Sequence, residues 1–109
     1  MKTMKYDKLV RDKIPDIICK KGEEFTYRKA SDEEYFFYLK KKLVEEVKEF
    51  MEKPSLKEMA DVQEVMNFLV KELGHTQPDL RMERSKKNED RGSFHDRWIL
   101  EEVRHKGEE

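Results

Sequence analysis

The stretch that decides the fold is Glu45-Glu46-Val47-Lys48-Glu49-Phe50-Met51-Glu52-Lys53-Pro54-Ser55-Leu56-Lys57-Glu58-Met59-Ala60-Asp61. It holds one acidic pair, three residues apart, on each side of a turn that Pro54 indicates. Residues that face each other across an antiparallel helical hairpin have position numbers with a constant sum. That sum is the same for Glu46 with Asp61 as for Glu49 with Glu58. The stretch therefore predicts a hairpin of two helices with the acidic pairs opposite each other.

The four acidic residues of this stretch are predicted to form a metal site. Residues three apart lie on one helix face, and packed helices lie about 8–10 Å apart, so the four carboxylates can converge on one small volume. Like charges so close together repel one another and need a cation. Oxygen ligands alone suit a hard ion, Mg²⁺ or alternatively Mn²⁺, which keeps several waters and binds substrate phosphates. The predicted ligands are Glu46, Glu49, Glu58 and Asp61.

The alternative is a solvated, ion-paired helix face. Charged residues make up 45% of the chain, against about 25% in an ordinary domain, so acidic pairs arise by chance. Basic and acidic residues also stand four apart, a spacing that favours ion pairs on a helix. These pairs are Lys41 with Glu45, Lys42 with Glu46 and Lys48 with Glu52. The spacing alone leaves both interpretations open.

Two long helices are bounded by residues typical of helix ends. Ser31, followed three residues later by Glu34, forms a capping box that opens a helix running to about Glu52. Ser55 opens a second helix in the same way, and Gly74 can end it in a left-handed conformation. The hairpin therefore has one helix on each side of the predicted turn.

Further elements are predicted on both sides of the hairpin. Thr76 as N-cap indicates a third helix that ends near Arg91. Residues 15–21 form a possible short helix, and the alternation in residues 25–30 is typical of a strand. Residues 97–103 are compatible with either strand or helix. The predicted fold class is mainly α, with possible short strands at these two places.

Apolar residues recur at helical spacing on both hairpin helices and predict their packing. The stripe on the first helix is Phe36, Leu39, Leu43, Val47 and Phe50, and that on the second is Met59, Val62, Met66, Leu69 and Leu73. A second line on the first helix, formed by Phe37, Val44 and Met51, cannot be covered by the same hairpin partner. A second copy of the hairpin would cover it in a four-helix bundle, so a homodimer or higher even oligomer is predicted, although the third helix is an alternative cover.

Composition bounds the remaining possibilities. With 109 residues and 36% hydrophobic content, the chain is predicted to be one domain over residues 1–109. A net charge of -1 gives no overall attraction to nucleic acid or to a membrane, and neither is an expected partner. No signal peptide or membrane span is recognisable, so a cytoplasmic location is expected. Cys19 is the single cysteine, and the histidines have no metal-site spacing.

Two basic clusters are candidates for binding a phosphate chain, because no glycine-rich nucleotide loop is present. The first is Lys8, Arg11 and Lys13, and the second is Lys86, Lys87, Arg91 and Arg97. Each cluster alone is typical of solvated surface. Their interest depends on the acidic site, since a cation combined with Arg and Lys side chains neutralises a reacting triphosphate.

Three segments together resemble the MazG-like, all-α nucleoside triphosphate pyrophosphohydrolases. They are the acidic motif Glu45-Glu46-x-x-Glu49 with Glu58-x-x-Asp61, the opening Lys8-Leu9-Val10-Arg11-Asp12-Lys13-Ile14-Pro15, and the closing Arg91-Gly92-x-Phe94-x-x-Arg97. The last two are similar to a small branch of that superfamily described as phosphoribosyl-ATP pyrophosphohydrolase-like. The likeness extends from Tyr6 to Val103.

The resemblance implies a Mg²⁺-dependent attack of water on the α-phosphorus of a nucleotide, which yields a nucleoside monophosphate and pyrophosphate. It assigns metal binding to the four acidic residues and makes Glu45 a candidate to orient or deprotonate the water. The residues it implies for phosphate contact are Lys87, Arg91 and Arg97, together with Arg11 and Lys13.

Three functions remain open from the sequence. The first is a house-cleaning enzyme that hydrolyses noncanonical or surplus nucleoside triphosphates. The second is phosphoribosyl-ATP hydrolysis in histidine biosynthesis. The third is a non-catalytic helical dimerisation module, in which the acidic residues only provide solubility. Mg²⁺-dependent release of pyrophosphate separates the two enzymes from the module.

Overall fold

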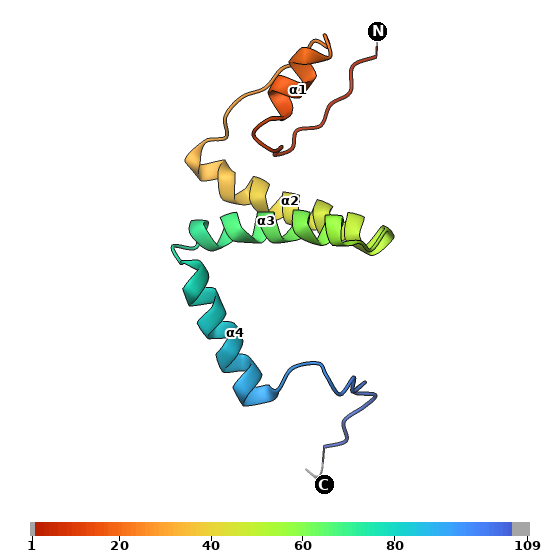
Figure 1. Ribbon diagram of the computed structural model, residues 1–109, viewed down its shortest axis with the longest axis vertical. Helices are drawn as coiled ribbons and strands as arrows, with labels where there is room; N and C mark the ends of the chain where they lie inside the picture. Colours follow the sequence, from red (N-terminus) through yellow and green to blue (C-terminus); the bar gives the residue numbers. More distant parts are fainter. Residues whose placement is uncertain (1, 106–109) are drawn as a thin grey trace. The chain divides into compact units, whose positions relative to one another are not determined.

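The chain is built from helices, as the sequence predicts. A computed structural model describes residues 2–105. The helices are α1 (Ile14–Lys20), α2 (Asp32–Glu52), α3 (Leu56–Glu72) and α4 (Gln77–Arg91), shown in Figure 1. The mainly α fold class is confirmed. In the part of the chain that the structure describes, each helix is too short or too polar to cross a membrane.

The described residues divide into two compact units. The first extends to Gln77 and contains α1, α2 and α3, and the second begins at Pro78 and contains the rest of α4 and the residues after it. The acidic motif and the first basic cluster lie in the first unit. A single domain over residues 1–109 therefore stays a prediction.

The helix boundaries follow from caps that the sequence identifies. The Ser31 hydroxyl accepts a hydrogen bond from the Glu34 backbone N–H at 3.3 Å, and the Ser31 N–H donates to Glu34 Oε1 at 3.0 Å. Ser55 accepts from the Glu58 N–H at 3.2 Å. These bonds satisfy backbone donors that would otherwise be unpaired in the first helical turn, so α2 and α3 start where predicted.

The end of α3 is set by a left-handed residue. Gly74 has φ +81°, a conformation in which any other residue is strained. The His75 N–H then donates to the Val70 carbonyl at 3.1 Å, and the Gly74 N–H donates to the Lys71 carbonyl at 2.9 Å. These bonds complete the last turn of α3, and the chain then continues into α4.

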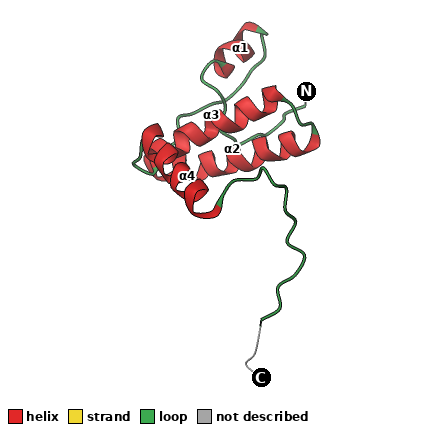
Figure 2. Ribbon diagram, turned by 60° about the horizontal axis from the view of Figure 1, so that its bottom comes forward, coloured by secondary structure: helices red, strands yellow, loops and turns green. Residues whose placement is uncertain are grey.

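The core lies between α2 and α3, which run antiparallel and side by side (Figure 2). Its most buried side chain is Leu39 of α2, which is 2% exposed and packs with Val65 and Leu69 of α3. Partly buried apolar side chains surround them. These are Leu9, Tyr35, Phe36 and Leu43.

The predicted stripe on α3 needs a correction. Met59, Met66 and Leu73 are 54%, 37% and 64% exposed, whereas Val65 is 9% exposed. The face of α3 that packs against α2 is therefore rotated by about one residue position from the predicted face. It contains Leu69, as predicted, together with Val65. Adjacent apolar residues such as Val65 and Met66 satisfy a helical period almost equally, so periodicity did not separate them. On α2 the stripe is confirmed at Leu39 but not at every position, because Val47 is 40% exposed.

The second apolar line on α2 is uncovered within the first unit, as predicted. Phe37, Val44 and Met51 are 52%, 68% and 71% exposed. The dimer that would cover them stays a prediction.

Short strands are absent from the described residues. Residues 25–30 and 97–103 are neither helix nor strand, because a strand needs a hydrogen-bonded neighbour and the described part of the single chain supplies none. The alternation at residues 25–30 is nevertheless visible: the rings of Phe25 and Tyr27 stack with centroids 5.1 Å apart.

Candidate metal centre

The site begins with a charged residue on the buried face of a helix. Glu46 stands seven residues after Leu39 and therefore lies on the same face of α2. Its side chain is 9% exposed, so it is more than nine-tenths buried. Lys42, one turn earlier, places Nζ 3.2 Å from Glu46 Oε1. The i, i+4 ion pair expected between these residues is confirmed, but it lies in a largely buried position and not on a solvated face.

Three of the four predicted metal ligands come together. One carboxylate oxygen from each of Glu46, Glu58 and Asp61 lies within 4.8 Å of the other two. Glu46 comes from α2, and Glu58 and Asp61 come from the first two turns of α3. The mirror register across the turn accounts for the approach, since Glu46 was predicted to face Asp61. Glu49, the fourth predicted ligand, is exposed and lies outside this group.

Two oxygens of this group lack hydrogen-bond partners. Glu46 Oε2 and Glu58 Oε2 are buried from solvent, and neither accepts a hydrogen bond. A buried carboxylate oxygen without a partner destabilises the folded state, because water solvated it in the unfolded chain. A cation among the three carboxylates would satisfy both oxygens. The donor set therefore fits a hard divalent ion such as Mg²⁺, which prefers oxygen ligands.

The protonation of Glu46 reflects the same crowding. Burial raises the pKa of Glu46 above its ordinary value, and the negative charges of Glu49 and Asp61 raise it further. The ammonium of Lys42 acts in the opposite direction but does not outweigh them. A bound cation would favour the ionised form, as Lys42 does in part.

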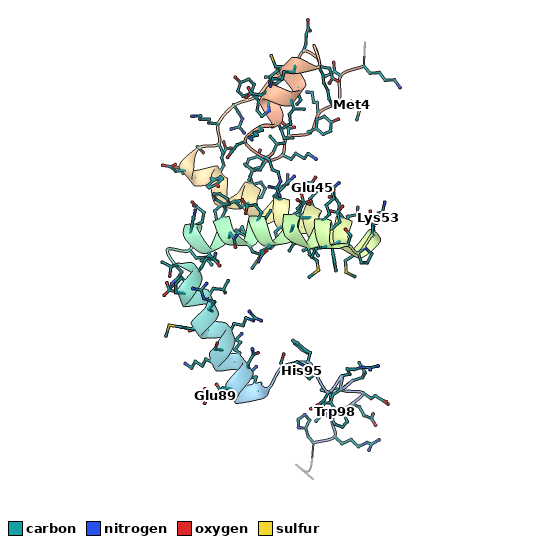
Figure 3. All side chains as sticks on the ribbon, in the orientation of Figure 1. Met4, Glu45, Lys53, Glu89, His95 and Trp98 are labelled. Atoms are coloured by element: carbon teal, nitrogen blue, oxygen red, sulfur yellow. The ribbon has the colours of Figure 1, made fainter. Side chains whose placement is uncertain are left out.

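Glu45, the predicted catalytic residue, is engaged with two lysines. Its Oε1 accepts a hydrogen bond from Lys8 Nζ at 2.8 Å, and its Oε2 accepts one from Lys42 Nζ at 3.4 Å. Partial burial acts to raise the pKa of Glu45, but the two lysines outweigh it and the pKa is lowered. Figure 3 shows Glu45 on α2, and it does not belong to the three-carboxylate group. A role of Glu45 in orienting or deprotonating water stays a prediction.

A hollow lies beside the carboxylates. Its volume is about 280 Å³. The lining combines positive, negative and apolar side chains from three segments, namely Lys8, Val10, Arg11, Ile14, Lys42, Glu46 and Asp61. Arg11 donates a hydrogen bond to Asp61 Oδ1 at 2.7 Å. Positive and negative side chains therefore alternate around the hollow, since Lys42 pairs with Glu46 and Arg11 pairs with Asp61.

Of the other predicted phosphate contacts, one belongs to the first unit and three belong to the second. Lys13 immediately precedes α1, is exposed and does not line the hollow. Lys87 and Arg91 on α4, and Arg97 after it, are exposed residues of the second unit. Their contact with phosphate stays a prediction.

Sequence reasoning missed the link between the first basic cluster and the acidic motif. The ion pairs of Lys8 with Glu45 and of Arg11 with Asp61 join residues that are 37 and 50 positions apart. Neither pair leaves a periodic signal, so no local pattern would have found them.

Comparisons with protein-family models, with curated proteins and with solved structures found no match to this chain.

Proposed function

We propose that the protein is a Mg²⁺-dependent nucleoside triphosphate pyrophosphohydrolase that hydrolyses noncanonical nucleotides, with Mn²⁺ as an alternative ion. The observation that carries this proposal is the group of three carboxylates, with two buried, unpartnered oxygens, beside a hollow that Lys8, Arg11 and Lys42 line. A cation held next to Arg and Lys side chains suits displacement at a phosphorus atom.

In this mechanism Glu46, Glu58 and Asp61 hold the ion. When bound, Mg²⁺ would neutralise phosphate oxygens and lower the pKa of a water molecule. Water adds to the α-phosphorus while the bond from that phosphorus to the bridging oxygen breaks. The products are a nucleoside monophosphate and pyrophosphate, and one proton is released. Glu45 keeps Lys8 and Lys42 at the site through its two hydrogen bonds.

The burial of Glu46 favours this function over a non-catalytic module. A solvated acidic face would leave the carboxylates in water, where ion pairs contribute little. Here the side chain is 9% exposed and Oε2 has no partner. Hydrolysis of phosphoribosyl-ATP uses the same chemistry and remains the second enzymatic candidate.

The test is a product assay with Mg²⁺ on canonical, oxidised and deaminated nucleoside triphosphates and on phosphoribosyl-ATP. Release of pyrophosphate and a monophosphate is expected. Glu58→Gln should lower kcat/KM by about 100-fold or more, because metal sites lose about 10–100-fold even when an outer partner is removed. Glu64→Gln, an exposed residue of the same helix, should retain parental activity.

Two results would contradict the proposal. One is release of orthophosphate and a diphosphate, which would place cleavage at the other anhydride bond. The other is the absence of Mg²⁺-dependent turnover on every nucleotide in the panel.

A further inference from the structure

The segment before α1 makes two ion pairs with the hairpin, one of them with a residue of the acidic group. We call residues 8–11 the N-terminal arm. Lys8 Nζ lies 2.8 Å from Glu45 Oε1, and an Arg11 guanidinium nitrogen lies 2.7 Å from Asp61 Oδ1. Asp61 is one of the three residues whose oxygens could hold a cation. A guanidinium therefore already contacts one of the three carboxylates.

Arg11 and a divalent cation would both contact the Asp61 carboxylate. The side chain of Asp61 is 29% exposed, and that of Arg11 is 58% exposed. A divalent ion among Glu46, Glu58 and Asp61 would both attract the Asp61 carboxylate and repel the guanidinium next to it. Arg11 can leave easily, because an exposed ion pair contributes little to stability.

The charges around the hollow indicate what Arg11 would bind next. Three positive side chains line it, Lys8, Arg11 and Lys42, against five carboxylates in or next to the site, Glu45, Glu46, Glu49, Glu58 and Asp61. Without a metal the balance is two negative charges, which disfavours an anion. A divalent ion neutralises these two charges, so the repulsion of an anion is removed only after the cation has bound.

We propose that Arg11 is a metal-dependent phosphate-binding residue: a divalent cation displaces it from Asp61, and with Lys8 it then binds phosphate groups in the hollow. This inference rests on the proposed metal centre. Arg11 suits both partners, since a guanidinium binds carboxylate and phosphate oxygens with the same fork of donors.

The lining of the hollow narrows the ligand class. Three of its side chains are positively charged and none is aromatic. A phosphate chain therefore has binding partners there, whereas a base has no ring to stack on. Recognition in the hollow depends on phosphate and not on the base, so inorganic pyrophosphate is an adequate probe.

The test measures two affinities of one variant by isothermal titration calorimetry. Arg11→Gln removes the competitor for Asp61, so Mg²⁺ alone should bind about two- to fivefold more tightly than to the parent, as expected for an exposed ion pair. Pyrophosphate, titrated in saturating Mg²⁺ with a protein-free titration subtracted, should bind about tenfold more weakly, as expected for a lost charge-assisted hydrogen bond. A gain in Mg²⁺ affinity together with a loss in pyrophosphate affinity would identify the exchange of Arg11 from Asp61 to phosphate.

Two further variants serve as controls. Lys5→Gln removes the same charge from an exposed residue that does not line the hollow, and it should match the parent in both titrations. Arg11→Lys keeps the charge but not the fork of donors, so its pyrophosphate affinity should fall between those of the parent and Arg11→Gln.

Several results would overturn the exchange. Unchanged or weaker Mg²⁺ binding by Arg11→Gln would show that Arg11 does not compete with the ion. Unchanged pyrophosphate binding by Arg11→Gln would show that Arg11 does not bind phosphate. No Mg²⁺ binding by parent and variant alike would overturn the exchange together with the metal centre. Opposite shifts in a protein that hydrolyses no nucleotide would support the exchange and refute the enzymatic function, so the two proposals fail separately.

Discussion

The interface between α2 and α3 has two ends that use the same helix face differently. At one end Leu39 packs against Val65 and Leu69. At the other end Glu46 approaches Glu58 and Asp61. The apolar end is a hydrophobic core of ordinary character, whereas the acidic end brings together like charges.

The two ends of the interface can be compared directly because their residues occupy equivalent positions on the two helices. Leu39 and Glu46 are seven residues apart on α2, and Glu58 and Val65 are seven residues apart on α3. Burial stabilises the hairpin at the apolar end. At the acidic end the same burial raises the pKa of Glu46 and leaves Oε2 without a partner. The acidic end therefore needs a ligand to become as favourable as its apolar counterpart.

The largest effect is expected at the apolar end. Leu39→Ala should lower the free energy of unfolding by about 2–5 kcal/mol, because it leaves a cavity at the most buried side chain. Urea denaturation followed by circular dichroism measures the loss. Leu56→Ala, at a position that is 83% exposed, should stay within about 0.5 kcal/mol of the parent. Similar losses in both variants would mean that the apolar end is not the main source of stability.

At the acidic end, stability should depend on the bound metal and not on the charge of Glu46 alone. Glu46→Gln removes one of the crowded charges, so the metal-free variant should be at least as stable as the parent. Mg²⁺ at about one hundred times its dissociation constant should stabilise the parent by about 2.7 kcal/mol, and the variant should lose most of this response. Thermal melting across a Mg²⁺ series tests both expectations. Equal changes of melting temperature with Mg²⁺ in the two proteins would show that the acidic end is an ion-paired surface and not a metal site.

The smallest effect distinguishes the charged start of α2 from the apolar end by its dependence on pH. Hydrogen bonds from Arg28 and from the Ser31 N–H lower the pKa of Glu34, at the start of α2, below its ordinary value of 4.5. A lowered folded pKa stabilises the protein above the unfolded value, and this contribution disappears as the pH falls through the folded pKa. The stability difference between the parent and Glu34→Gln should therefore be present at pH 7 and vanish well below pH 4.5.

The loss caused by Leu39→Ala should be the same at both pH values, since no titrating group is removed. Urea denaturation of both variants at pH 7 and near pH 3 makes the comparison. A gap for Glu34→Gln that persists in acid would show that its carboxylate acts through packing and not through charge.

Sequence reasoning predicted the helices well because their signals are local. The capping residues Ser31 and Ser55, with Gly74 after α3, mark helix ends through bonds to neighbouring backbone groups. The inward face of α3 was predicted less well, since Val65 and Met66 are adjacent and both apolar. Only packing against α2 decides between them.

The candidate site was predicted in part for a similar reason. The approach of Glu46, Glu58 and Asp61 follows from the register of one hairpin, which a constant sum of positions captures. Glu49 lies outside the group because helical rotation places it on an exposed part of α2. The contacts of Lys8 and Arg11 depend on where the N-terminal arm returns to the hairpin, and no residue pattern encodes that path.

The short distance along the chain between the acidic residues has a consequence for the order of folding. Fifteen positions separate Glu46 from Asp61 (61 − 46), whereas Arg11 and Asp61 are 50 positions apart. Closing a shorter loop loses less chain entropy, and local contacts form faster than distant ones. We therefore expect the carboxylates to assemble as the hairpin closes, before the N-terminal arm arrives.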